Sequence, residues 1–178
     1  AARAKGEPAA FDCYLWILQH VRTEPDRTPV YAALLADHVG SPKLVDAVRG
    51  LGRNQSSVAA EKFLRGVIEK SPHDEVKGTA TYALAGVLLS LSELCQKMAS
   101  PGWTPEERAM NEQYYGKETL EEVAARDAQE IAEEAEDLLE DVVAGSKEQK
   151  SLQPLATQAA GELFELRNLS VGKVAPDV

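Results

Sequence analysis

Two cysteines are the most reactive side chains in this sequence of 178 residues, and they lie far apart in the chain. Neither Cys13 nor Cys95 belongs to a Cys-x-x-Cys pair, so the spacing indicates neither thioredoxin-type redox chemistry nor a zinc knuckle. In an oxidising compartment the two could form a structural disulfide. Two separately buried thiols are the alternative. In both cases we expect the cysteines to have a structural role.

The three histidines show no spacing that supports metal binding or acid–base catalysis. His20, His38 and His73 are isolated, and the sequence contains no His-Glu-x-x-His, Glu-x-x-His or Gly-x-Ser-x-Gly pattern. No EF-hand loop spacing occurs among the many carboxylates. We therefore predict no catalytic residue, no metal site and no cofactor in this chain.

The acidic residues are concentrated in one segment. The formal net charge is −10, and residues 105–144 account for the excess of carboxylates. A chain this acidic disfavours a nucleic-acid partner, because phosphate backbones attract basic surfaces. One predicted helix face is either a solvated surface or a contact for a basic partner, and it comprises Glu130, Glu133, Glu134, Asp137, Glu140 and Asp141. Mutual repulsion of these groups predicts that their helix gains order on acidification.

The elements that hold these residues are expected to be helices throughout. Aromatic residues make up only 6% of a chain rich in Ala and Glu, and no segment alternates apolar and polar residues as a strand does. Ser/Thr-Pro pairs and two capping boxes, Ser71 with Asp74 and Thr104 with Glu107, mark helix starts. The expected helices cover about 10–22, 29–38, 42–49, 58–70, 72–99, 105–115, 117–144 and 152–168.

These helices form one domain over residues 10–168, between a flexible tail at 1–9 and an extended arm at 169–178. Residues 60–91 resemble residues 135–166, and each stretch predicts a helix, a turn marked by Ser71 or Ser146, and a second helix. Helical hairpins of the tetratricopeptide-like kind show this pattern, whereas chance similarity between Ala/Leu-rich helices is the alternative. The longest apolar run, residues 82–89, is too short for a transmembrane segment.

The carboxyl end resembles a known family. Its string Val-Gly-Lys-Val-Ala-Pro-Asp at 171–177 is similar to the opening of thioredoxin-fold redoxin domains of the thiol-disulfide reductase and alkyl hydroperoxide reductase type. Residues 71–85 and 115–139 resemble the helical region that precedes this domain in exported bacterial redoxin proteins. The resemblance implies a parent oxidoreductase or peroxidase. It assigns no catalytic residue here, because the family's reactive Cys follows this opening, and Cys13 and Cys95 match no active-site position.

The resemblance implies a non-catalytic helical region that binds a protein or peptide partner, or positions one, for a thiol-disulfide redoxin domain. The stretch Ala1-Ala2-Arg3-Ala4 suits the region around a signal cleavage site and predicts export to the periplasm. The alternative is a free-standing scaffold or assembly subunit. In that case an apolar seam of the 117–144 helix would pair with another subunit, through Leu120, Ala124, Ala128, Ile131, Ala135, Leu138 and Val142.

Overall fold

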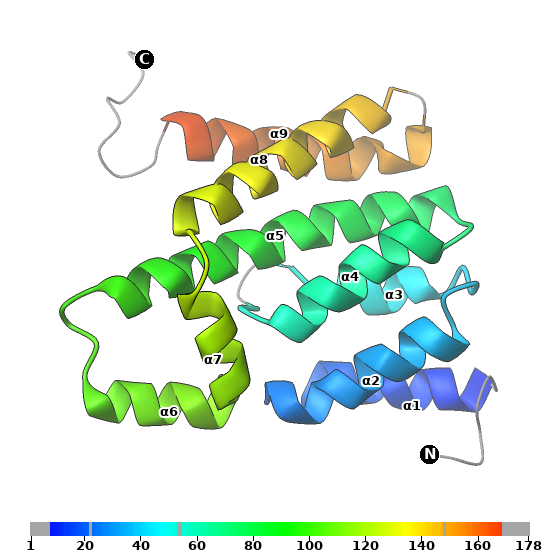
Figure 1. Cartoon of the computed structure of the whole chain (residues 1–178). Helices are drawn as coiled ribbons and strands as arrows, with labels where there is room; N and C mark the ends of the chain where they lie inside the picture. The colour runs from blue at the N-terminus through cyan, green and yellow to red at the C-terminus, as the bar shows by residue number, and fades with distance from the viewer. Residues whose placement is uncertain (1–7, 22, 53–54, 148, 169–178) are drawn as a thin grey trace.

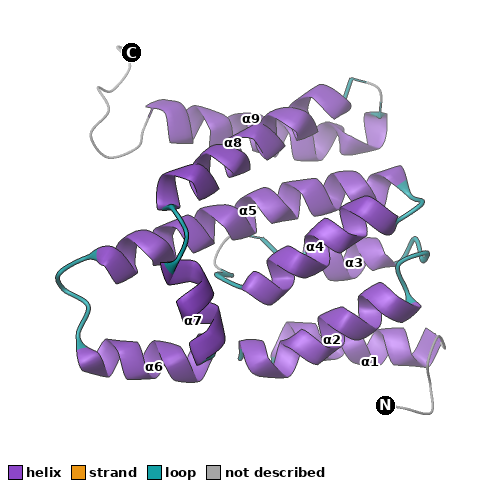
Figure 2. Cartoon of the chain, viewed as in Figure 1, coloured by secondary structure: helices purple, strands orange, loops and turns teal. Residues whose placement is uncertain are grey.

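A computed structural model describes residues 8–21, 23–52, 55–147 and 149–168, and all of the regular structure in these ranges is helical (Figure 2). The predicted all-α class is confirmed. Residues 1–7 of the predicted tail and the predicted arm at 169–178 lie outside the described residues, whereas Pro8 and Ala9, which end the tail predicted at 1–9, belong to the first helix. The elements are α1 (Pro8–His20), α2 (Glu24–Asp37), α3 (Leu44–Arg49), α4 (Val58–Lys70), α5 (Asp74–Ala99), α6 (Pro105–Tyr115), α7 (Lys117–Ala124), α8 (Ala128–Gly145), the short 3-10 helix η1 (Lys150–Leu152) and α9 (Gln153–Asn168).

The long helix α5 runs through the middle of the molecule. It packs against α3 and α4 on one side and against α8 on the other, with α1 and α2 beyond α4 and α9 beside α8 (Figure 1). Residues 83–92 of α5 are buried without interruption. A helix that is apolar all round requires neighbours on every side, so this stretch places α5 at the centre of the fold.

By length and composition, α5 is the one helix among the described residues that could cross a membrane. In the 18-residue stretch of α5 that is apolar enough to do so, 78% is buried inside the fold. Burial of this extent is typical of the core helix of a bundle, and it is consistent with the predicted absence of a transmembrane segment.

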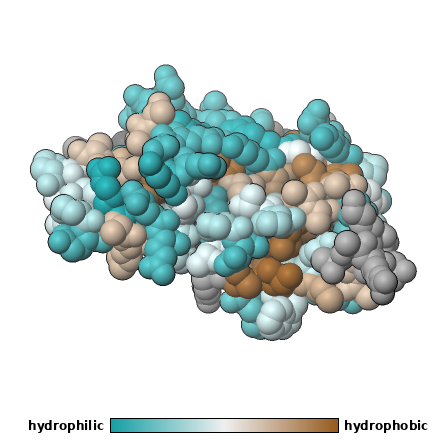
Figure 3. Space-filling view, turned by 60° about the horizontal axis from the view of Figure 1, so that its bottom comes forward, coloured by the Kyte–Doolittle hydropathy of each residue, from teal (hydrophilic) through white to brown (hydrophobic). Residues whose placement is uncertain are grey.

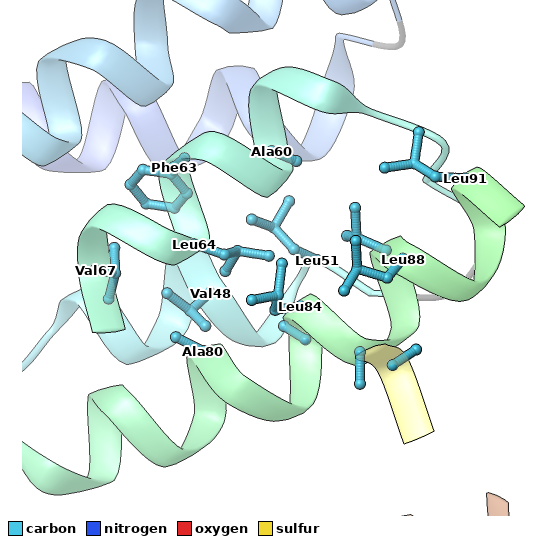
Figure 4. Close-up of a cluster of buried hydrophobic side chains, with 14 of the residues drawn as sticks. Val48, Leu51, Ala60, Phe63, Leu64, Val67, Ala80, Leu84, Leu88 and Leu91 are labelled. Atoms are coloured by element: carbon cyan, nitrogen blue, oxygen red, sulfur yellow. The ribbon is translucent and has the colours of Figure 1, made fainter. Parts of the chain in front are cut away.

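The main core lies where α3, α4 and α5 meet. Figure 4 shows Leu64 of α4 directed toward Leu84 of α5, with Val48 of α3 beside them. Leu64 and Leu88 are completely inaccessible to solvent. The apolar residues of α4 recur at helical spacing, which explains why its predicted limits, 58–70, agree with the structure.

The prediction for the second helix is wrong at its start. This helix, α2, begins at Glu24 and contains Pro29 within it, rather than starting at Pro29. Pro29 lies in the second turn, where it removes only one intrahelical hydrogen bond. Thr28 does not cap a helix that starts at Pro29. It lies within α2, and its hydroxyl donates to the Glu24 carbonyl oxygen at 2.9 Å. The Thr28-Pro29 pair was therefore a misleading start signal, and Pro25, in the first turn, is the true one.

The predicted single helix over 117–144 is two helices, α7 and α8, with a break at residues 125–127. The side chain of Asp127 caps α8 by accepting hydrogen bonds from the backbone N–H groups of Gln129 and Glu130, at 2.7 and 3.2 Å. Two side chains of α5 hold the break: Cys95 Sγ donates to the Arg126 carbonyl, and Ser92 Oγ to the Ala128 carbonyl.

The predicted apolar seam packs inside the chain. Ile131, Ala135 and Val142 of α8 are buried, and α5 makes its most extensive helix contact with α8. The change of helix direction leaves Ala124 exposed and buries Val123. The seam is therefore not available in the form that pairing with another subunit requires.

Other starts differ by smaller amounts. The Thr104–Glu107 capping box is present at α6, as predicted. Ser71 instead ends α4, and α5 begins at Asp74, so the second predicted box is wrong. The first and third helices also begin elsewhere than predicted, at Pro8 and Leu44, and η1 precedes α9.

The two stretches of the internal repeat form two neighbouring pairs of helices. Residues 60–91 form most of the α4–α5 pair, and residues 135–166 most of the α8–α9 pair. In each pair the helices follow one another after a short connection and pack side by side (Figure 1). The matched glycines differ in environment, because Gly86 is buried in α5 whereas nothing approaches the Cβ position of Gly161.

Two glycine substitutions should change stability in opposite directions. A Cβ at Gly78 would lie 2.6 and 2.7 Å from the Cδ atoms of buried Leu152. Overpacking costs about 1–3 kcal/mol, more than the gain of about 1 kcal/mol from replacing a helical glycine. Urea unfolding followed by circular dichroism should show that Gly78→Ala lowers the free energy of unfolding. The matched control Gly161→Ala should raise it, and a gain for both would contradict the packing.

Candidate binding site

A buried carboxylate at the start of α2 connects this helix to the start of α4. Glu24 is 4% exposed, and its Oε1 accepts hydrogen bonds from Ser57 Oγ at 3.0 Å and from the Ala59 backbone N–H at 2.8 Å. Ser57 is the N-cap of α4, and its hydroxyl oxygen accepts from the Ala60 N–H at 2.9 Å. Glu24 thus supplies an acceptor and a negative charge at a helix N-terminus, where the backbone dipole favours both.

The environment of Glu24 opposes its ionisation. Burial raises the pKa of this carboxyl above 4.5, and the bonds from Ala59 and Ser57 and the charge of Arg27 only partly offset that effect. The second oxygen, Oε2, has no hydrogen-bond partner. One oxygen of the carboxylate therefore holds α4, while the other is buried without a partner.

Tyr31 is the second buried polar group of this region. It is 3% exposed, and its ring stacks on Phe63 with the ring centroids 5.2 Å apart. Its hydroxyl oxygen has no hydrogen-bond partner, and burial raises its pKa to about 12. The Arg27 guanidinium lies 5.7 Å from the centre of this ring and donates through Nη2 to the Leu18 carbonyl at 3.0 Å.

Glu24 and Tyr31 both line a cavity of about 380 Å³ between α2, α4 and α7, named here the α2–α4–α7 cavity. Its volume falls within the roughly 300–1,000 Å³ range of small-molecule sites. Its lining combines apolar side chains with Glu24 and Tyr31, and three charged side chains lie among the remaining lining residues. The lining residues are Glu24, Thr28, Tyr31, Ala32, Leu35, Val58, Ala59, Lys62, Phe63, Glu118, Thr119 and Glu122.

A second charged cluster joins α4 to the α7–α8 turn. Glu61 is 6% exposed and lies between two arginines: its Oε2 accepts from Arg126 Nη1 at 2.8 Å, and its Oε1 from Arg65 Nη2 at 2.9 Å. Arg65 also donates to both carboxylate oxygens of Glu134 on α8, at 2.7 and 2.9 Å. The pairs within this cluster satisfy one another, so it is a structural clamp between α4 and α8.

The six carboxylates of the predicted acidic face of α8 fall into two groups, paired and solvent-exposed. Glu134 pairs with Arg65, which lowers the pKa of Glu134, and Glu140 pairs with Arg167 on α9. The remaining members, Glu130, Glu133, Asp137 and Asp141, have exposed side chains. Two of the six carboxylates thus hold neighbouring helices, and the other four face solvent.

The two cysteines are not joined. Cys13 is exposed on α1, and Cys95 is buried on α5, where its thiol donates to the Arg126 carbonyl at 3.3 Å. Cys95 therefore has a structural role at the α7–α8 turn. No group of three or more His, Cys, Asp or Glu side chains within the described ranges is arranged to hold a metal ion.

Exposed apolar side chains are spread over several helices. In Figure 3, hydrophilic side chains cover most of the face, and apolar side chains gather mainly in its right half. The large exposed ones are Trp16 on α1, Met110 and Tyr114 on α6, and Phe164 on α9. Because single exposed apolar residues are common on proteins, they do not by themselves mark a site.

The sequence patterns do not single out Glu24 or Tyr31. The expected start of the second helix at Pro29 left Glu24 outside any helix. A signal was present in Thr23-Glu24-Pro25, where a hydroxyl residue precedes an acidic residue and a proline, as at many helix starts. Nothing in the sequence indicates that this carboxylate reaches α4, because residues 24 and 59 meet only in the folded chain. A comparison with family models, curated proteins and solved structures finds no match to this chain.

Two substitutions of Glu24 should distinguish the effect of losing its hydrogen bonds from the effect of losing its charge on the free energy of unfolding. Glu24→Ala leaves the Ser57 hydroxyl and the Ala59 N–H without their acceptor, which costs about 1–3 kcal/mol of unfolding free energy. Glu24→Gln keeps an acceptor oxygen and should cost less. Urea unfolding measures both, with Glu69→Gln, an exposed residue of α4, as the control. A Glu24→Ala variant as stable as the wild type would contradict the capping role.

The Gln variant should also reveal the raised pKa of Glu24. A folded-state pKa above 4.5 gives a contribution to stability that is present below pH 4.5 and is lost as the pH rises through the folded value. The wild type should therefore lose stability relative to Glu24→Gln over that interval. A constant difference between the two proteins from pH 4 to pH 8 would count against the raised pKa.

Acidification should weaken the contact between α4 and α8. The pKa of Glu134 is lowered from 4.5, so its contribution is present above that pH and is lost as the pH falls through the folded value. The Glu134 side chain is 41% exposed, which limits this contribution to a few tenths up to about 1 kcal/mol. Unfolding at pH 7 and pH 3 should show a smaller acid loss for Glu134→Gln.

This expectation is opposite to the gain of order that repulsion alone predicts for residues 117–144. Amide hydrogen exchange in α8 distinguishes the two. Once the rates are divided by the intrinsic exchange rate at each pH, lower protection of α8 at low pH indicates that the ion pairs dominate, whereas higher protection indicates that relief of repulsion dominates.

Proposed function

We propose that this chain is a non-catalytic helical interaction and positioning region that precedes a thiol-disulfide redoxin domain, in a protein exported to the periplasm. The family part of the proposal rests on the resemblance of residues 171–177 to the opening of such domains. The positioning part rests on how the chain reaches that string, through α9.

The observation that carries the positioning role is the attachment of the last turn of α9. Arg167 pairs with Glu136 and Glu140 of α8, which raises the pKa of the Arg167 guanidinium. One turn and a half earlier, Tyr82 of α5 donates to Glu162 Oε1 at 2.6 Å. These contacts hold the last turns of α9 against α8 and α5, which fixes Asn168, the end of this helix, on the helical domain.

One exposed apolar side chain lies beside this attachment. Phe164 is 52% exposed on α9, one turn before Arg167. A redoxin domain starting a few residues later would lie within reach of this ring, and a partner or substrate protein could contact both parts.

The proposal first requires that the native protein continue into a redoxin domain. Intact mass and peptide mapping of the native protein should show residues beyond Val178 that contain a thioredoxin-fold domain with a reactive Cys. A native chain that ends at Val178, or that continues without such a cysteine, would overturn the redoxin part.

The positioning role can be tested in the native protein by the variant Arg167→Gln. This change should lower the rate of reduction of a protein disulfide severalfold and leave the reduction of a small-molecule disulfide unchanged, because the chemistry itself is not altered. Arg108→Gln, on the exposed surface of α6, is the control. Equal effects on both substrates, or no effect on either, would argue against positioning.

A further inference from the structure

Two residues that line the α2–α4–α7 cavity each carry a buried polar atom without a hydrogen-bond partner. Glu24 Oε2 and the Tyr31 hydroxyl oxygen belong to side chains that are 4% and 3% exposed, and both residues line this cavity. A buried polar group without a partner lowers the stability of a fold, and such groups in folded proteins require an explanation. A ligand that donates hydrogen bonds to both atoms supplies one.

We propose that the α2–α4–α7 cavity binds an alkylammonium group, whose N–H bonds donate to Glu24 Oε2 and to the Tyr31 hydroxyl oxygen. The alkyl stem would lie along the apolar wall formed by Leu35 and Phe63. This site does not depend on the proposed redoxin context.

The charges around the cavity favour a cation. Its lining includes three carboxylates, Glu24, Glu118 and Glu122, and one basic residue, Lys62. Lys62 Nζ is already paired with Glu122 Oε2 at 2.8 Å. Arg27, whose positive charge acts on Glu24, does not line this cavity and donates to the Leu18 carbonyl instead. A positively charged ligand would therefore meet an excess of negative charge.

The hydrogen bonds of Glu24 select an ammonium over a guanidinium. A guanidinium binds a carboxylate best through two parallel bonds, one to each oxygen. Ser57 and Ala59 already donate to Oε1, so only Oε2 is available. An ammonium is a compact charge with three donors, and it can use one carboxylate oxygen and the phenol oxygen separately.

Calorimetric titration of the full chain with n-butylammonium chloride at pH 7 tests the site, with n-butanol as the neutral ligand of similar size. We expect saturable binding with one site per chain for butylammonium, and none for butanol. Glu24→Gln should weaken binding about tenfold or more, since a hydrogen bond to a charged group contributes about 1.5–3 kcal/mol. Tyr31→Phe, which keeps the ring, should weaken it severalfold.

Asp141→Asn is the matched control, because it removes the same charge from an exposed position on α8. Glu24→Gln retains an acceptor for Ser57 and Ala59, so it should stay folded, which circular dichroism verifies. Equal weakening by Glu24→Gln and Asp141→Asn would overturn the proposal, because it would indicate unspecific attraction to an acidic chain. Equal binding of butanol and butylammonium would overturn it as well.

Lys62 is the competitor within the chain. Its removal in Lys62→Gln should strengthen butylammonium binding, because it frees Glu122. Binding that occurs only in Lys62→Gln would overturn the proposal for the native protein, since Lys62 would then be the occupant of its own site.

Two further ligands identify the source of the ammonium group. Nα-acetyl-lysine methylamide carries the group as a partner protein would, and its Nε-acetylated form lacks the charge. Binding of the first but not the second supports a lysine of a protein partner. Binding of butylammonium without binding of the lysine ligand supports a free amine.

Discussion

The hydrogen bonds of the Glu24 carboxylate are the interaction on which the candidate site depends. They attach the first turn of α2 to the first turn of α4 and satisfy backbone and side-chain donors that α4 cannot satisfy by itself. The same contact brings Tyr31 of α2 against Phe63 of α4, which forms the aromatic side of the cavity. One oxygen, Oε1, thus holds the helices together. The other, Oε2, has no partner in the chain, and in our proposal it accepts a hydrogen bond from the ligand.

Carboxylates of the acidic segment also connect helices to one another, as Glu24 does. Carboxylates of α8 that face other helices are paired with arginines: Glu134 with Arg65 of α4, and Glu140 with Arg167 of α9. Arg126 completes the set by joining the α7–α8 turn to Glu61. The acidic segment is therefore partly a set of attachments between helices. Only the carboxylates that face solvent remain available to a basic partner. An ion pair formed at such an exposed position contributes little to stability.

Local patterns predicted the helices whose ends depend on local chemistry. The limits of α4 follow from its apolar spacing and its Ser57 cap, and the start of α6 follows from the Thr104–Glu107 box. The predictions were wrong where distant contacts decide. Pro29 looked like a helix start, although α2 begins earlier, with Glu24 reaching α4. The helix over 117–144 looked continuous, although Ser92 and Cys95 of α5 hold the carbonyl groups of a break that Asp127 caps.

The sequence by itself determined that the chain is helical and that the acidic charge lies in residues 105–144. These properties depend on composition and on spacing within single elements, which the sequence contains directly. Only the tertiary structure decided which carboxylates are paired, and that Glu24 and Tyr31 share one cavity. Those contacts join residues that are distant in the chain, and the packing of α2, α4 and α7 around the α5 core sets their positions.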